Sequence, residues 1–151
     1  MVGHAFEARI YAENPRNNFL PDSGTLLYLS TPTPTHTFAP SYPSVDRSDT
    51  TTSPISALGP AESGDSGLQI APSLRIEQGF RQGSLIGVFY DPMIAKVVVH
   101  GRNRTEALRL LRKALDEYYV VGVSTNVEFL RCLAGNRAFI DEEVETGFIQ
   151  V

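Results

Sequence analysis

The first patterned stretch of the chain alternates apolar and polar residues. Between Phe6 and Glu13, Phe, Ala, Ile and Ala occupy the even positions, and Glu, Arg, Tyr and Glu occupy the odd ones. A period of two over this length predicts a half-buried β-strand with its apolar side toward a core. A proline among asparagines at 14–18 then predicts a turn. We expect residues 19–20 to return to the core and residues 25–29 to form a second strand.

A different composition follows from Ser30 to Ser73. Pro, Ser, Thr, Gly and Asp dominate this segment, and its apolar residues are single and without a period. Such a composition buries too little apolar surface to offset the entropy lost on ordering. A loop of this length inside a compact domain is usually disordered or an insertion. We therefore expect one domain over 1–151, interrupted by a disordered Pro/Ser/Thr-rich insertion at about 30–73.

Two further strands are predicted after this segment. Residues 74–81 mix apolar and polar positions, and residues 93–100 have the near-continuous apolar body of a central strand. The apolar run at 85–90 between them ends at an Asp-Pro break. Lys96 interrupts the apolar run of 93–100. We expect it either to reach an edge or to pair with an acid, with Asp91 as the nearest candidate.

Helical periodicity marks the C-terminal third. Apolar residues recur there at spacings of three and four, namely Ala107, Leu108, Leu111, Ala114, Leu115 and Tyr118. This stripe predicts a helix. We expect Thr105 to be its N-cap and the helix to end at 120–122, with Gly122 as the C-cap. Pairs at helical spacing support its polar side, namely Arg112–Asp116 and Lys113–Glu117.

A capping-box sequence at 125–128 predicts a second helix, which ends at Gly135–Asn136. Strands therefore come first along the chain and helices last. This order predicts an α+β domain with a mainly antiparallel sheet and two C-terminal helices packed on it.

Composition narrows the class of function. A chain of 151 residues can bury a core, and its net charge of -4 argues against a non-specific nucleic-acid binder. No apolar run reaches membrane-spanning length. The single cysteine, Cys132, excludes an internal disulfide and a cysteine metal cluster, and we expect it to be a buried thiol. Because the strand pattern begins almost at Met1, we expect the natural chain to continue upstream.

The polar face of the first strand carries the candidate chemistry. Arg9 lies between Glu7 and Glu13, carboxylates that can hold a guanidinium while it offers fixed donors to an anion. The alternative on spacing alone is a surface strand with ion pairs. There is no glycine-rich phosphate loop, nucleophile elbow or paired-histidine metal site, since the three histidines are scattered. The chain is therefore not expected to be a complete enzyme or to bind a metal.

Four stretches together resemble the C-terminal domain of the biotin carboxylase family: GHAFEARIYAENP, FLPDSG, FYDPMIAKVVVHGRNRTEAL and VGVSTNVEFL. The resemblance covers 3–30 and about 74–149, and the segment between them has no counterpart. Within the family, LSTP and YYVVGVSTNVEFL are most similar to the biotin-carrying subunit of 3-methylcrotonyl-CoA carboxylase. Propionyl-CoA, acetyl-CoA and pyruvate carboxylases share much of the pattern and remain alternatives.

The resemblance implies a reaction in which ATP and magnesium activate bicarbonate, and biotin is carboxylated at its ureido N1. Arg9 matches the catalytic arginine of the family, where a preorganised guanidinium stabilises charge on the ureido oxygen. Glu7 would orient Arg9, and Asp91 matches an aspartate near the biotin pocket with a positional role. Arg75 matches an arginine of the bacterial homodimer interface. The aromatic residue that precedes it by three positions is Pro72 here, which puts that homodimer in doubt.

The implied partners are the upstream ATP-grasp part of the same subunit, which holds ATP and magnesium, a biotin carrier domain and a carboxyltransferase subunit. The Ala-Met-Lys-Met motif that bears biotin does not occur in the chain. The resemblance also implies leucine degradation, with a mitochondrial matrix location in a eukaryote and a cytoplasmic one otherwise, and an isolated chain that is inactive. An assembly or regulatory module that keeps the fold is the alternative from another class, supported by the long insertion and the missing nucleotide site.

Overall fold

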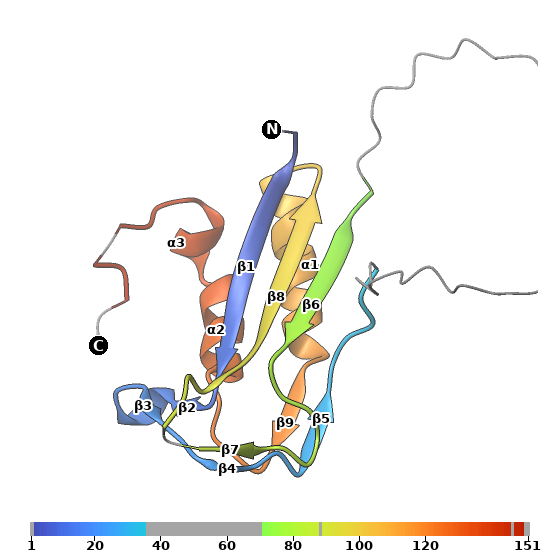
Figure 1. The fold of residues 1–151 in the computed structure, drawn as a ribbon. Coiled ribbons are helices and arrows are strands. Elements are labelled where there is room, and N and C mark those ends of the chain that lie inside the picture. The colour runs from blue at the N-terminus through green and yellow to red at the C-terminus, as the bar shows by residue number, and fades with distance from the viewer. Residues whose placement is uncertain (1, 36–70, 88, 146, 150–151) are drawn as a thin grey trace, which may run out of the picture. The chain divides into compact units, whose positions relative to one another are not determined.

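The computed structural model describes residues 2–35, 71–87, 89–145 and 147–149. Its main sheet has three antiparallel strands in the order β1–β8–β6 (Figure 1). They are β1 (His4–Tyr11), β8 (Met93–Gly101) and β6 (Ser73–Gln78). The apolar run at 93–100 is therefore the central strand, as predicted. The β1 strand has β8 on one side only, so it is an edge strand of this sheet.

The sheet buries one face. Alternate residues of each strand lie in the core, among them Ala8, Ile10, Leu74, Val97 and Val99. The residues between them point to the other face and are exposed or half-buried. The helices pack against the buried face, with α1 (Arg104–Asp116) behind the strands and α2 (Val127–Gly135) beside it (Figure 1). The α+β class and the antiparallel sheet are as predicted.

All six residues of the predicted helical stripe are buried. The N-cap of the helix lies two residues before the predicted Thr105. Asn103 is the N-cap, because its backbone is extended and its Oδ1 accepts a hydrogen bond from the backbone N–H of Glu106 at 2.9 Å. Thr105 lies inside the first turn. Of the two predicted pairs on the polar side, Lys113–Glu117 forms at 3.9 Å, whereas Asp116 faces Arg131 instead.

The predicted end of this helix is wrong. The helix stops at Asp116, and Tyr119–Val121 forms β9, which pairs with β5 (Tyr28–Ser30). Arg131 on α2 explains the early stop, because its guanidinium donates to the carbonyls of Leu115 at 2.9 Å and Tyr118 at 3.2 Å. The last carbonyls of a helix have no N–H partner within the helix, and here the Arg131 side chain supplies donors in its place. Gly122 follows a strand rather than a helix.

Three short strand pairs extend the domain below the main sheet (Figure 1). One consists of β2 (Glu13–Asn14) and β3 (Leu20–Pro21), joined through the 3-10 helix η1 (Pro15–Asn17). Another consists of β4 (Gly24–Thr25) and β7 (Leu85–Ile86), and β5–β9 is the third. The turn predicted at 14–18 is confirmed, with Asn18 in the left-handed region at φ 49°. The single strand predicted at 25–29 is instead divided between β4 and β5.

Several other predictions need correction. Cys132 is exposed, because it falls on the outward side of α2. Leu20, Phe89 and Tyr90 are also exposed, so the apolar residues near them do not all enter the core. Phe19 is half-buried and contacts Phe129 edge-on at 5.0 Å between ring centroids, but neither ring is part of the core formed by the described residues. A short third helix, α3 (Arg137–Ile140), was not predicted.

The predicted insertion lies mostly beyond the described residues. Residues 30–35 and 71–73 are described and lead out of β5 and into β6. Residues 36–70, including His36, are outside the described part. Among the residues that the structure describes, no helix combines the length and the apolar character needed to cross a membrane.

Candidate functional site

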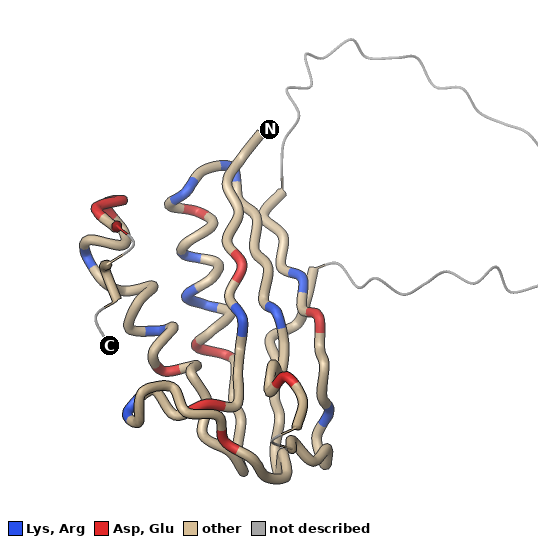
Figure 2. The backbone as a smooth tube through the Cα atoms, turned by 60° about the vertical axis from the view of Figure 1, so that its left-hand side comes forward, with Lys and Arg blue, Asp and Glu red and all other residues tan. Residues whose placement is uncertain are grey.

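The exposed face of the main sheet carries charged residues in register. Arg9 on β1 lies opposite Lys96 on β8, which lies opposite Glu77 on β6. In the next row, Glu7 and Arg75 flank Val98. Basic and acidic positions therefore alternate along β1 and β6 (Figure 2). These charged residues of three different strands become neighbours only when the strands pair.

Arg9 is held by one carboxylate. Its Nε lies 2.7 Å from Oε1 of Glu7, and both side chains are about half exposed. The hydrogen bond to Arg9 lowers the pKa of Glu7, and the same bond, with help from the phenol of Tyr11, raises the pKa of Arg9. Because Nε is engaged, the two terminal nitrogens present the remaining four N–H donors of the fork.

Glu13 does not complete the expected pair of carboxylates. It lies on β2, beyond the end of β1, and burial raises its pKa above the usual value. The prediction that two acids hold Arg9 is therefore correct for Glu7 and wrong for Glu13. The physical reason is that the strand ends at Tyr11, so the alternation of faces does not continue to position 13.

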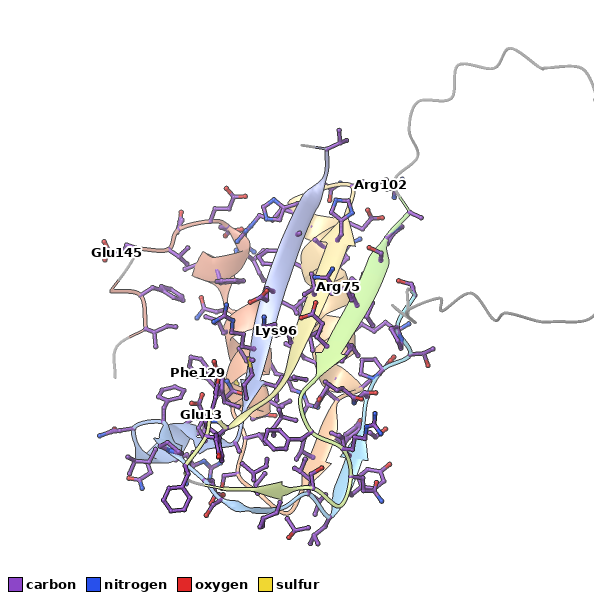
Figure 3. The ribbon with its side chains drawn as sticks, viewed as in Figure 1. Glu13, Arg75, Lys96, Arg102, Phe129 and Glu145 are labelled. Atoms are coloured by element: carbon purple, nitrogen blue, oxygen red, sulfur yellow. The ribbon has the colours of Figure 1, made fainter. Side chains whose placement is uncertain are left out.

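Lys96 on β8 and Arg75 on β6 share the carboxylate of Glu77, which also lies on β6. Lys96 Nζ lies 4.0 Å from Oε2 of Glu77, and Arg75 Nη2 lies 3.2 Å from Oε1 of the same residue. Lys96 and Arg75 lie on the face of the sheet away from the helices (Figure 3). The expected pairing of Lys96 with Asp91 is wrong, because cross-strand neighbours come closer than residues further along one strand.

Asp91 has a backbone role at the start of β8. Its Oδ1 accepts a hydrogen bond from the backbone N–H of Met93 at 3.1 Å. Met93 pairs with Tyr11, and the N–H of Ala12 donates to the carbonyl of Pro92 at 2.9 Å. Asp91 therefore lies at the same end of the sheet as the end of β1. Among the described residues, no hydrogen bond or ion pair joins Asp91 to Arg9.

Asn126 is the neighbour of Arg9 that the sequence did not reveal. It is the N-cap of α2 in place of Thr125, the first residue of the capping box predicted at 125–128, and its side chain makes no capping hydrogen bond. Instead its Oδ1 accepts from the N–H of Tyr11 at 3.0 Å, and its Nδ2 donates to the carbonyl of Arg9 at 3.1 Å. Nothing in local sequence spacing could have indicated contacts to residues so far away along the chain.

The arrangement suits an anion or a polarised oxygen. The exposed fork of Arg9 offers planar donors that match a carboxylate or a ureido oxygen, and Lys96 across the strand adds positive potential. A metal is a different case. In the part of the chain that the structure describes, no group of three His, Cys, Asp or Glu residues could hold a metal ion. The described residues on this face therefore offer hydrogen-bond donors and positive charge to an anionic group.

Known proteins are similar to this chain in sequence. Residues 65–151 match the family model of the biotin carboxylase C-terminal domain. The chain is 44% identical over 149 residues to the mitochondrial methylcrotonoyl-CoA carboxylase subunit alpha of Dictyostelium discoideum, and 43% identical to that of Rattus norvegicus. Both alignments cover 99% of this chain and 16% of the relative. The human mitochondrial propionyl-CoA carboxylase alpha chain is 31% identical, over 97% of this chain and 15% of its own length.

Solved structures agree with the fold. Urea carboxylase of Kluyveromyces lactis superposes with a TM-score of 0.68 at 28% identity, covering 97% of this chain and 10% of that protein. Pyruvate carboxylase of Rhizobium etli superposes with a TM-score of 0.69 at 26% identity, covering 98% of this chain and 11% of that one. The chain thus spans only a small part of the proteins that it matches.

Proposed function

The chain belongs to the biotin carboxylase C-terminal domain family, and from this we propose that it forms one part of a biotin carboxylase module within a biotin-dependent acyl-CoA carboxylase. The observation that carries the proposal is Arg9, whose guanidinium is held by Glu7 on the exposed face of the sheet. ATP and magnesium would be bound by other parts of the parent protein. The isolated chain would then lack carboxylase activity.

Arg9 can do one chemical task with the groups around it. Biotin, when bound, supplies the ureido nitrogen that takes up the carboxyl group, and negative charge develops on its ureido oxygen. The terminal N–H groups of Arg9 would donate to that oxygen, as donors of an oxyanion hole do, with an effect of roughly 3–4 kcal/mol on the barrier. Glu7 fixes the fork through Nε, so the terminal donors are oriented before the charge develops.

Asp91 and Arg75 have supporting roles in this proposal. Asp91 holds the start of β8 next to the end of β1, which would keep one wall of the biotin pocket in place. Arg75 lies on the same face of the sheet as Arg9. In this structure it forms an ion pair with Glu77 of the same chain. We propose that it contributes to a contact with another part of the assembly rather than to a bacterial-type homodimer.

The parent enzyme that we propose is 3-methylcrotonyl-CoA carboxylase, acting in leucine degradation in the mitochondrial matrix. Identities of 44% and 43% to two subunits of this enzyme, against 31% to a propionyl-CoA carboxylase chain, support this choice. The proposed partners are the upstream ATP-grasp part, a biotin carrier domain and a carboxyltransferase subunit. Propionyl-CoA, acetyl-CoA or pyruvate carboxylase is the alternative parent, since the domain itself does not select the acyl group.

The test uses the full-length subunit with free biotin, bicarbonate and MgATP. Arg9→Ala should lower the kcat of biotin carboxylation by about 10²- to 10³-fold and leave the KM for ATP unchanged. Arg9→Lys should also lose most activity, because an ammonium lacks the planar fork. Arg109→Ala, a change of an exposed arginine on α1, is the matched control and should have no effect. Near-wild-type turnover of Arg9→Ala would refute the proposed role.

A further inference from the structure

Asn126 differs from the three asparagines whose side chains do form caps or turns in this domain. The Oδ1 atoms of Asn14, Asn103 and Asn136 each accept a hydrogen bond from an N–H two or three residues ahead, within their own turns. The Asn126 amide instead bonds to Arg9 and Tyr11 on β1, and only 6% of the residue is exposed. A buried amide with distant partners is costly to leave unpaired, so its position is fixed by those partners.

The amide acts as a short substitute for a neighbouring strand. The β1 strand is an edge strand, and its free edge presents backbone groups that require partners. Asn126 supplies three: Oδ1 accepts from Tyr11 N, Nδ2 donates to Arg9 O, and its backbone N–H donates to Tyr11 O at 3.3 Å. These contacts hold the peptide units on both sides of Ile10.

Asn126 holds β1 where its pairing with β8 is irregular. Between Ile10 and Tyr11 the register with β8 shifts, since Ile10 pairs with Ala95 and Tyr11 pairs with Met93. Irregularities of this kind bend a strand and interrupt its ladder of hydrogen bonds. Without a partner on the free edge, the backbone directly after Arg9 would be supported from one side only.

We propose that Asn126 is a positioning residue for Arg9, whose backbone it clamps so that the guanidinium leaves the sheet in a fixed direction. The inference rests on the proposed function of Arg9 and adds a residue of the α2 loop to it. Among the described residues, no hydrogen bond joins the Asn126 side chain to Glu7 or to the guanidinium, so its link to Arg9 is through the backbone. Misplacement of a reacting group by about 1 Å can cost roughly 10²-fold in rate.

The substitution that separates these bonds is Asn126→Asp. The carboxylate has nearly the same shape and can still accept from Tyr11 N, but it cannot donate to Arg9 O and places two acceptors face to face. Asn103→Asp is the matched control, because a carboxylate caps α1 as well as an amide does. Both variants, together with Arg9→Ala and the double variant Arg9→Ala/Asn126→Asp, are made in the full-length subunit.

The readouts are the kcat of free-biotin carboxylation, the KM for ATP and the thermal midpoint of unfolding. We expect Asn126→Asp to lower kcat by about 10- to 100-fold with an unchanged KM for ATP, and Asn103→Asp to leave both unchanged. In the Arg9→Ala background, Asn126→Asp should lower kcat by less than about twofold, because residues that act as a unit are not additive. A merely structural role would instead give the same fold-loss in both backgrounds.

Each outcome decides a separate question. Wild-type kcat in Asn126→Asp, or equal losses with and without Arg9, would overturn the positioning role alone. An unchanged kcat in Arg9→Ala would overturn the proposed function of Arg9 and the inference with it. If Asn126→Asp does not fold, Asn126→Ser replaces it in the same four-way comparison, because its shorter side chain cannot bridge Tyr11 N and Arg9 O as the amide does. The outcomes are then interpreted in the same way.

Discussion

Thr35 and Leu74 are hydrogen-bonded neighbours although 39 positions separate them in the sequence. The backbone N–H of Thr35 donates to the carbonyl of Leu74 at 2.9 Å, and the N–H of Leu74 donates to Oγ1 of Thr35 at 2.6 Å. The two described segments that flank residues 36–70 therefore lie side by side. A closed entry and exit point is what a domain needs to carry an inserted segment without a change of fold.

Replacement of residues 36–70 by a Gly/Ser link of about four residues should leave the domain folded. Because the loop becomes roughly eightfold shorter, the entropy of closing it falls, and the free energy of unfolding should rise by ~2 kcal/mol. Urea denaturation of this chain, followed by circular dichroism, measures the change. A variant with the same residues of 36–70 in scrambled order is the control and should match the wild type. Loss of the folded state in both would show that this segment supports the fold.

Arg131 should be a major stabilising residue of the helical layer. It donates to carbonyls at the end of α1 and lies over the ring of Tyr119 at 5.8 Å. Arg131→Met keeps the apolar stem but removes the donors, and should lower the free energy of unfolding by about 2 kcal/mol. Arg109→Met changes an exposed arginine on α1 and should lie within about 0.5 kcal/mol of wild type. Equal values for the two variants would contradict this role.

Tyr118 should make stability depend on pH at the alkaline end. Burial raises the pKa of its phenol to about 12 from 10.0, and among the described residues its hydroxyl has no hydrogen-bond partner. The raised pKa means that the neutral form is favoured in the fold. Its contribution is therefore fully present below pH 10 and lost as pH rises toward 12, by roughly 2–3 kcal/mol.

Tyr118→Phe tests this dependence by urea denaturation between pH 8 and pH 12. In the variant, the part of the decrease in unfolding free energy between pH 10 and pH 12 that comes from Tyr118 ionisation should be absent. It should equal or exceed the wild type in stability below pH 10, because no unpaired hydroxyl is buried. Tyr28→Phe, at a half-exposed tyrosine, serves as the control and should follow the wild-type profile. Identical pH profiles for Tyr118→Phe and wild type would exclude the mechanism.

Two glycines should respond oppositely to alanine. Gly122 has φ +118°, and a Cβ atom there would meet the backbone of Thr25 and lie 2.9 Å from the backbone N of Leu27. Gly122→Ala should therefore cost more than about 3 kcal/mol. Gly135 ends α2 with open space around it, so Gly135→Ala should stabilise by about 0.5–1 kcal/mol. Thermal unfolding of both variants tests the contrast, and a tolerated Gly122→Ala would contradict it.

The parts of the fold that local pattern predicted are those in which one period persists. The alternation of β1, the apolar body of β8 and the stripe of α1 were predictable because burial on one face repeats along the element. The end of α1 was not. Tyr119–Val121 reads as a continuation of the helix, and its pairing with β5 is a contact between distant segments. Tertiary pairing overrides a local preference of this kind.

The candidate site shows the same division. The contact between Arg9 and Glu7 was predictable, because residues two positions apart on a strand lie on the same face. The position of Lys96 opposite Arg9 depends on the register between β1 and β8. The contact of Asn126 with the Arg9 backbone depends on where the loop before α2 is placed. Neither has a signal in the local sequence. The capping-box motif at 125–128 assigned the cap to Thr125 and gave no sign of the contacts that Asn126 makes. The exposure of Cys132 likewise depends on how α2 is rotated against the sheet.

The register of β1 also determines when this domain can fold during synthesis. His4 pairs with Gly101, so the strand that carries Arg9 leaves the ribosome long before β8, its partner among the described strands, has been made. Pairings of such large sequence separation form slowly, and an unpaired edge is open to wrong partners meanwhile. Arg9 therefore stands on a strand that is translated well before the described strand with which it pairs, and the backbone edge of β1 that faces β8 is unpaired over that interval.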